Sequence, residues 1–328
     1  MKVLVTGAGG FVAAHLVDFL RTEAPDAELF GMVRPQTGAA RGPGAGISLV
    51  EADVNDPAGA EAALDEVVPD RIVHLAGQSS VHRSWIEPGS TLRTNVLGLV
   101  NLLDAVRRRG LRPAVLVVGS AEEYGPVDPA ELPITERTPL RPSSPYAVSK
   151  VAQAALARLY GPAGGMRVVL TRTFHHTGPG RGEAFAESSF ARQLAEIEAG
   201  LRPPVLRVGN LDAVRDYTDV RDVVRAYWAL LDRGEGGEVY NVCSGRGRPV
   251  RELLDALLRA AGADAEVQVD PARLRRADVP VLVGDPSRLR DATAWEPRIP
   301  LERTLVDLLE DWRQRVGVSA PSPRGVTE

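Results

Sequence analysis

Short apolar runs alternate with helix-like segments through the first half of the chain, and this alternation limits the possible folds more than any other feature. The runs have the length and composition of strands buried on both faces, and they occupy residues 2–6, 28–33, 47–52, 71–75, 114–119 and 167–173. Apolar residues at helical spacing occur at 11–20 and 92–109. Strands that alternate with helices predict an α/β fold with a doubly wound parallel sheet. Ligands of such sheets bind beyond the carboxyl ends of the strands.

The pattern changes after residue 173. Helices are predicted at 185–200, 223–231, 250–261 and 301–316, and a strand at 238–243. Because 328 residues exceed one ordinary domain, we predict two. A Rossmann-type nucleotide-binding domain takes residues 1–173 and about 209–237, and a smaller α/β C-terminal substrate-binding domain takes about 174–208 and 238–318. The Gly- and Pro-rich segment 35–46 is predicted to be a mobile loop, and the tail 319–328 to be disordered.

Composition excludes several classes of protein. A net charge of −4 and a pI near 5.9 argue against a nucleic-acid-binding surface. The single cysteine, Cys243, rules out an internal disulfide framework and fits a core residue in a reducing compartment. No apolar run approaches a membrane span and no signal peptide is evident, so we expect a cytoplasmic protein that binds no membrane. The paired histidines His175 and His176 lack further ligands at metal-binding spacing, so no metal is expected.

The first strand runs into a glycine turn. Gly7-Ala8-Gly9-Gly10 separates residues 2–6 from the helix that starts at Phe11, with the spacing Gly7-x-x-Gly10-x-x-Ala13. Such a turn at a helix N-terminus can cradle a pyrophosphate on backbone N–H groups. We therefore expect Gly7, Gly10, Phe11 and Val12 to bind a dinucleotide; the alternative is a plain tight turn.

The ends of the later strands supply further candidates. No carboxylate follows the second strand to accept the ribose hydroxyls of NAD, and Arg34 stands there instead. We therefore expect NADPH or NADH with a preference for NADP, the alternative being a solvated arginine. Asp53 and Val54 are placed to touch an adenine. Leu75 ends the fourth strand, and the small residues Ala76 and Gly77 after it would let a dinucleotide approach. Ser79 and Ser80 lie beyond them and face substrate or act as local caps.

Tyr146 and Lys150 form the candidate catalytic pair. Ser144 is a good N-cap and Pro145 suits the first position of a helix, so Tyr146 and Lys150 share one helix face. An ammonium near a phenol favours the phenolate and lowers the tyrosine pKa. A Tyr-x-x-x-Lys spacing alone is usually helix surface. Lysine, however, occurs here only at Lys2 and Lys150, among 39 lysines and arginines, which favours a chemical role.

With Ser120 at the end of the fifth strand, these motifs resemble the extended short-chain dehydrogenases/reductases that act on nucleotide sugars. The resemblance covers nearly the whole chain. It is greatest to the reductases that convert GDP-4-keto-6-deoxy-D-mannose to GDP-D-rhamnose, with the GDP-mannose 4,6-dehydratases as a sister group. It is carried by HLAGQSSV (74–81), GSAEEYG (119–125), SPYAVSKVAQ (144–153), FHHTGPG (174–180), GNLDAVRDYTDVRDVVRAYW (209–228), YNVCSG (240–245) and RRADVPVLVGDPSRLR (275–290).

The resemblance implies a role for each matching residue. Ser120 would hydrogen-bond the sugar C4 carbonyl, Tyr146 would protonate that oxygen as hydride arrives, and Lys150 would lower the Tyr146 pKa and bind the nicotinamide ribose. Phe174 would contact the cofactor. Arg215 and Arg276 would bind the diphosphate and Asp278 the nucleotide ribose, although each alone would more often be a solvated charge. The other implied substrate contacts are Ser79, Ser80, His175, Arg192 and Asn210.

Ser120-Ala121-Glu122 bears on which reaction is catalysed. A 4,6-dehydratase has a Thr-Asp-Glu or Thr-Ser-Glu run here, and Glu122 occupies the position of its base, so dehydration stays open. Ala121 cannot move a proton, which favours a reductase over a dehydratase or another nucleotide-sugar reductase or epimerase. A non-catalytic dinucleotide sensor would be expected to lack one of the three catalytic residues. Three departures from the family are Ala13 for glycine, His175 for asparagine and Ala277 for proline.

The apolar faces of helices 92–109 and 145–160 suggest an assembly. As in the family it resembles, the chain is expected to form a homodimer through a four-helix bundle, or a tetramer. The alternative is that these faces only cover the sheet.

Overall fold

The computed structural model describes residues 1–35, 46–274 and 279–317. The predicted tail at 319–328 lies outside these ranges. The predicted mobile loop at 35–46 also lies outside them, apart from residues 35 and 46. No described helix is long and apolar enough to cross a bilayer.

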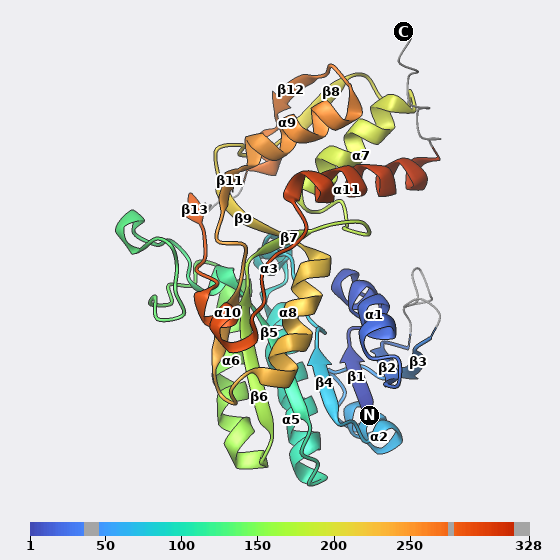
Figure 1. Cartoon of the computed structure of the whole chain (residues 1–328), viewed down its shortest axis with the longest axis vertical. Helices are drawn as coiled ribbons and strands as arrows, with labels where there is room; N and C mark the ends of the chain where they lie inside the picture. Colours follow the sequence, from blue (N-terminus) through green and yellow to red (C-terminus); the bar gives the residue numbers. More distant parts are fainter. Residues whose placement is uncertain (36–45, 275–278, 318–328) are drawn as a thin grey trace.

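A seven-stranded sheet, parallel throughout, forms the centre of the larger part (Figure 1). Its order is β10-β6-β5-β4-β1-β2-β3, which extends the order typical of Rossmann folds by one strand. The predicted fold class is confirmed. The strands are β1 (Lys2–Thr6), β2 (Glu28–Val33), β3 (Ser48–Glu51), β4 (Arg71–His74), β5 (Ala114–Ser120), β6 (Arg167–Thr173) and β10 (Val239–Val242).

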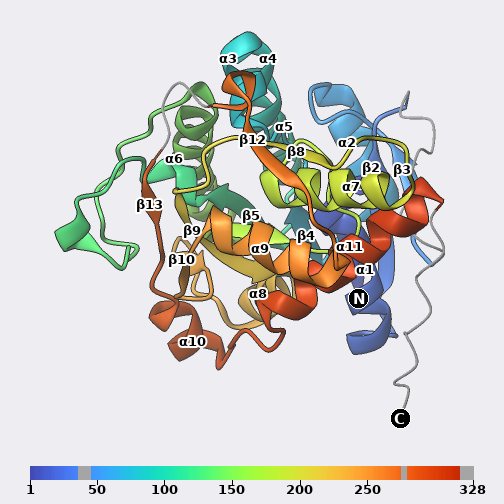
Figure 2. The same cartoon turned by 90° about the horizontal axis from the view of Figure 1, so that it is seen from above.

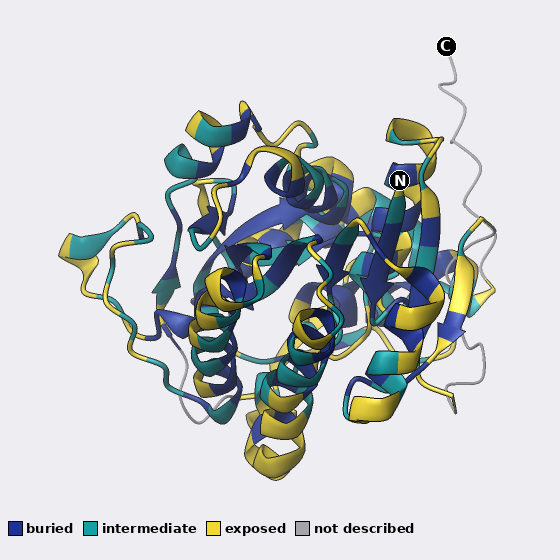
Figure 3. Ribbon diagram, turned by 90° about the horizontal axis from the view of Figure 1, so that it is seen from below, coloured by how far each residue is buried: buried dark blue, intermediate teal, exposed yellow. Residues whose placement is uncertain are grey.

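Helices cover both faces of this sheet, which explains why its strands are apolar on both sides. Helices α1 (Phe11–Glu23), α8 (Val220–Arg233) and α10 (Ser287–Thr293) pack in one core. Helices α2 (Pro57–Val67), α5 (Gly98–Arg108) and α6 (Pro145–Gly164) pack in the other. The burial colouring of Figure 3 shows the dark, buried sheet between partly exposed helices.

The helix predicted at 92–109 is interrupted. Helix α4 (Pro88–Leu92), preceded by α3 (Val81–Ile86), leads into a π-helical turn η1 (Arg93–Leu97) before α5 begins. The wider turn carries the buried Asn95, whose amide bonds to the backbone N and O of Gln78 and to the Ser149 hydroxyl. The helix thus changes its geometry where a side chain links α6 to the end of β4.

The smaller part stands over the carboxyl edge of the large sheet (Figures 1 and 2). One small sheet has the order β11-β9-β13, with β7 also paired to β9, and a second pairs β8 with β12. Helices α7, α9 and α11 pack together in its core. The bounds are β7 (His175–Thr177), α7 (Ala186–Glu198), β8 (Val205–Val208), β9 (Val214–Asp219), β11 (Gly247–Pro249), α9 (Val250–Ala261), β12 (Glu266–Val269), β13 (Val281–Leu282) and α11 (Leu301–Val316). The short 3-10 turns are η2 (Ala121–Glu123), η3 (Pro129–Glu131) and η4 (Pro271–Arg273).

Three elements pack on the other side of the predicted boundary. Strand β10 and helix α10, expected in the smaller domain, pack with the large sheet, because β10 pairs with β6 and α10 packs on α8. Strand β9, expected in the larger domain, is the centre of a small sheet. Apart from these segments, the division into two domains stays a prediction.

Candidate active site

The glycine turn between β1 and α1 lies against the end of β4. Gly7 has a φ of +68°, and a Cβ there would come within 2.8 Å of the Ala76 backbone, so only glycine fits without strain. Helix α1 begins after Gly10 with no side-chain cap, which leaves its first N–H groups available to a bound anion. Ala13 is fully buried in the core below, so its methyl group is accommodated where the family has glycine.

Ser120 and Tyr146 meet at the carboxyl end of β5. The Ser144 hydroxyl accepts a hydrogen bond from the Ala147 N–H (3.1 Å), and Pro145 opens α6, so the predicted helix start is confirmed. The Ser120 hydroxyl lies close enough to the Tyr146 phenol to act on it and favours its ionised form. Tyr146 and Lys150 are each 7% exposed.

Burial governs the protonation of both catalytic groups. It lowers the pKa of Lys150 to about 8, and the ammonium donates to the Val118 carbonyl and to Gln153 Oε1, each at 2.8 Å. It raises the pKa of Tyr146 above its usual value, with only partial opposition from the Ser120 hydrogen bond. The predicted net fall in the Tyr146 pKa is therefore wrong for this structure, because desolvation of the phenol outweighs neighbouring charges.

Gly77 connects the turn to the catalytic lysine. A Cβ on Gly77 would lie 3.1 Å from Asn95 Oδ1 and 3.8 Å from Lys150 Nζ. With Ala76 against Gly7, the structure places the turn, the end of β4 and Lys150 side by side. Parallel strands make this possible, since their carboxyl ends share one edge.

Charged side chains shift the pKa of the Tyr146 phenol in opposite directions. Glu122, half-buried in η2, raises the Tyr146 pKa, while Arg181 lowers it. The Arg181 guanidinium lies 5.0 Å from the Phe11 ring centroid and 3.4 Å from that of Phe185. Sequence reasoning missed Arg181, because it follows a Gly-Pro-Gly turn with no spacing signal. We add it to the candidate site, between the start of α1 and the phenol.

Four predicted cofactor contacts lie farther along the strand ends. Arg34 is exposed just after β2. The Asp53 carboxylate accepts from the backbone and side-chain nitrogens of Asn55, both at 2.9 Å, and the buried Val54 packs against Gly98. The Phe174 ring is 2% exposed within a core cluster. Its side chain therefore packs in the core rather than in an open cofactor groove.

The predicted substrate residues have mixed surroundings. Ser80 caps α3 by accepting from the Arg83 N–H at 3.1 Å, which is the local-cap alternative, and Ser79 is exposed. Arg192 lies between Glu183 and Glu196, so it would have to leave two carboxylates to bind phosphate.

Two of the other predicted substrate residues, His175 and Arg215, lie on the paired strands β7 and β9. The His175 ring lies 5.5 Å from that of Tyr217, across the β7–β9 pair. Arg215 is buried on β9, and the exposed Asn210 accepts from the Asp212 N–H at 3.0 Å. Arg276 and Asp278 lie outside the described residues, as does Ala277.

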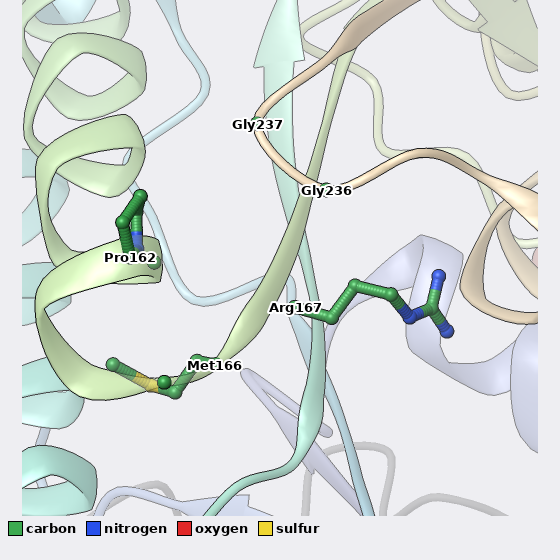
Figure 4. A pocket seen from close by; sticks show the side chains of 7 residues that line it. Pro162, Met166, Arg167, Gly236 and Gly237 are labelled. Carbon is green, nitrogen blue, oxygen red and sulfur yellow. The ribbon is translucent and has the colours of Figure 1, made fainter.

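A hollow of about 320 Å³ elsewhere is not part of this site. Figure 4 shows its lining, which includes Pro162, Met166 and Arg167 at the start of β6. This is the amino edge of the sheet, opposite Ser120, and the Arg167 guanidinium already donates to the Gly234 carbonyl at 2.7 Å. Within the described ranges, no group of His, Cys, Asp and Glu is arranged to hold a metal ion.

A Rossmann sheet whose carboxyl edge carries a glycine turn, a Ser–Tyr pair and a buried lysine defines a class of dinucleotide-dependent oxidoreductases. The model of the GDP-mannose 4,6 dehydratase family matches residues 4–308. The chain belongs to this family of extended short-chain dehydrogenases/reductases.

Known proteins similar to the chain include both reductases and dehydratases. A GDP-6-deoxy-D-mannose reductase from Pseudomonas aeruginosa is 39% identical over 96% of this chain and 98% of its own length. The structure of RMD from Pseudomonas aeruginosa complexed with NADPH has a TM-score of 0.84 and 37% identity, covering 96% of this chain and 99% of that one. A GDP-mannose 4,6-dehydratase from Vibrio cholerae is 31% identical over 78% of this chain and 76% of its own.

Proposed function

We propose that this enzyme reduces the C4 ketone of GDP-4-keto-6-deoxy-D-mannose to GDP-D-rhamnose with NADPH or NADH. The observation that carries the proposal is that Ser120, Tyr146 and Lys150 are all buried at the carboxyl edge of the sheet, where the glycine turn ends β1 and Ser120 acts on the Tyr146 phenol. The 39% identical reductase supports the same reaction.

The residues present fit a nicotinamide dinucleotide. Gly7 lets the turn pack directly against the Ala76 backbone, because a Cβ on Gly7 would lie only 2.8 Å from it. The start of α1, which has no side-chain cap, suits a pyrophosphate. We propose that Arg181 lies near that pyrophosphate and that Lys150, beside Gly77, bonds the nicotinamide ribose. Arg34 in place of a carboxylate supports a preference for NADP.

The bound cofactor supplies the hydride, and the chain supplies the proton. Tyr146 donates its phenolic proton to the C4 oxygen, a role suited to a group whose pKa burial has raised. Ser120 donates a hydrogen bond to the same oxygen, where negative charge develops. The Lys150 ammonium places a positive charge nearby and stabilises the phenolate that remains.

Ala121 favours reduction over dehydration. A dehydratase must also remove the C5 proton and expel the C6 hydroxyl, which needs an acid and a base beside the tyrosine. Glu122 lies near the Tyr146 phenol and would serve as the base. Ala121, however, is 2% exposed and packs with Tyr124 and Phe174, so no proton donor stands at that position.

The diphosphate and nucleotide contacts stay proposals. Arg215, buried on β9, is the best placed to bind a phosphate among the described candidates, and Arg276 and Asp278 are proposed beside it from the family pattern. Asn210 and His175 are proposed as weaker contacts. Arg192 is the least favoured, because of its two carboxylate partners.

Two parallel reactions test the function: the first is followed by cofactor absorbance at 340 nm, and the second by mass spectrometry of the sugar product, because dehydration returns its NADP unchanged. One contains GDP-4-keto-6-deoxy-D-mannose with NADPH or NADH, and the other GDP-mannose with NADP. We expect cofactor oxidation in the first and no keto sugar in the second. Keto-sugar formation in the second, without reduction in the first, would instead make the enzyme a dehydratase.

We also propose a homodimer built from helices α5 and α6, with a tetramer as the larger alternative. These helices cover the sheet, yet Leu97, Val148 and Leu159 on η1 and α6 remain 54%, 46% and 69% exposed, more than buried packing requires. A cytoplasmic location is proposed as well, since the buried free thiol of Cys243 fits a reducing compartment.

A further inference from the structure

An ion pair lies directly behind the catalytic serine, and the proposed reaction uses neither of its members. Glu123, in η2, is fully buried, and Arg172, on β6, is 5% exposed. Glu123 Oε2 lies 3.0 Å from Arg172 Nε, and Glu123 Oε1 accepts a hydrogen bond from the Ser120 N–H at 2.9 Å. Burying two charges is costly even when they are paired, so this pair is a weak source of stability.

Neighbouring groups fix the position of the Glu123 carboxylate. Arg172 also donates to the Tyr124 hydroxyl at 3.1 Å, which fixes the guanidinium. Gly119 precedes Ser120, and a Cβ there would overlap both the Thr171 carbonyl and Glu123 Oε1. The chain therefore keeps a glycine where any side chain would displace the carboxylate.

Burial raises the pKa of Glu123, and the Arg172 guanidinium and the Ser120 N–H oppose that rise and favour the charged carboxylate. The Glu123 charge acts on both groups that handle the proton. It opposes the fall that burial causes in the Lys150 pKa, and it raises the Tyr146 pKa. Both effects favour the protonated form, which a ketone reduction requires of each group. Four other titratable or charged groups interact with Lys150 or Tyr146. They are His74 on β4, Glu122 in η2, Arg181 in the segment before α7, and Tyr227 on α8.

We propose that Glu123, held by Arg172, is a positioning residue that fixes Ser120 against Tyr146 and supplies the negative charge that Lys150 faces. The proposal rests on the reductase function above. It differs from a purely structural role, because a neutral residue of the same shape would keep the Ser120 hydrogen bond and lose the charge.

The two lysines of the chain make the charge effect directly measurable. In protein labelled with ¹³C at lysine Cε, NMR should show two signals, one from Lys150 and one from Lys2, which serves as an internal reference. We expect Lys150 to titrate near 8 in the wild type and at least about 0.5 pH units lower in Glu123→Gln, since a nearby opposite charge shifts a pKa by about one unit or more. This readout does not depend on any substrate.

Activity supplies the second readout. In Glu123→Gln, kcat should fall about tenfold, its alkaline limb should move to lower pH by a similar amount, and the Kd for NADPH should stay within about twofold. Glu136→Gln is the matched control. The Glu136 carboxylate accepts from the Asn241 N–H at 2.7 Å in the same network, and its charge is not among the main causes that shift the pKa of Lys150 or Tyr146. Its pH profile should match the wild type.

A double variant guards against misfolding, since Glu123→Gln leaves Arg172 buried without its carboxylate. Glu123→Gln with Arg172→Met removes both charges, and it should fold with Lys150 still titrating below its wild-type value. Folded variants in which Lys150 and the alkaline limb stay at wild-type positions would overturn the proposal. If instead the wild type fails to reduce the keto sugar while the Lys150 titration shifts as expected, the proposed function fails and the role of the Glu123 charge stands.

Discussion

At the scale of single residues, burial decides the chemistry of Tyr146 and Lys150. The phenol keeps its proton over a wide pH range because burial raises its pKa, while Lys150, with a pKa of about 8, changes charge near neutrality. We therefore expect the titration of Lys150 to limit activity at alkaline pH. Tyr146 and Lys150 were predictable from their spacing, but the direction of the tyrosine shift was not, because the degree of burial cannot be read from spacing.

We predict that kcat/KM for NADPH falls as pH rises through about 8. The sign follows from the Lys150 pKa: below it the ammonium is present to bind the cofactor ribose, and above it the neutral amine remains. This parameter reports groups of the free enzyme, so initial rates from pH 6 to 10 test it. A profile flat through pH 9 would contradict the assignment of Lys150.

Tyr146→Phe should keep the fold and NADPH binding but reduce turnover by about 10²- to 10⁴-fold, the usual contribution of a positioned general acid. Single-turnover rates and a fluorescence titration with NADPH separate the two effects. Turnover at the wild-type level would remove Tyr146 from the mechanism.

At the scale of elements, the strands of the large sheet followed from apolar runs, and the start of α6 from Ser144 and Pro145, whereas the strand order was not predicted. The segments that sequence reasoning missed are short or irregular. Strand β9 was obscured by Arg215 and Asp216, charged residues that the fold buries. Asp216 is satisfied there by the N–H groups of Ser244 and Gly245, at 2.8 and 2.9 Å, partners that lie far away in sequence.

Gly7→Ala tests the glycine turn. The added Cβ would press on the Ala76 backbone at a positive φ, so we expect at least about tenfold weaker NADPH binding, since strain of this kind costs on the order of 1–3 kcal/mol. Gly110→Ala is the control, because Gly110 has a φ of +65° with nothing within 4 Å of its Cβ and ends a helix far from the turn. Isothermal titration with NADPH compares the two; equal affinities would refute a steric role for Gly7.

At the scale of the whole molecule, the chain crosses between the two parts several times. Strand β10 returns to the large sheet after β9 has joined the small one. Composition does not mark these crossings, which explains why the boundaries predicted from position were displaced. These crossings place β7 and β9, which carry the proposed substrate contacts His175 and Arg215, above the carboxyl edge that holds Ser120.

The dimer prediction belongs to this scale. Leu97→Glu places a charge in the exposed apolar surface of η1, so light scattering after gel filtration should show a dimer for the wild type and a monomer for the variant. Gln314→Glu is the control, because Gln314 is exposed on α11. A monomeric wild type would contradict the assembly.

Transfer of deuterium tests the central claim most directly. The enzyme is incubated in ordinary water with GDP-4-keto-6-deoxy-D-mannose and NADPH that carries deuterium on both positions of nicotinamide C4, and the product is read by mass spectrometry and proton NMR. Direct reduction predicts one deuterium per product, bound to sugar C4, with Tyr146→Phe giving almost none. A wild-type enzyme that consumes the keto sugar without placing deuterium at C4 would contradict the account.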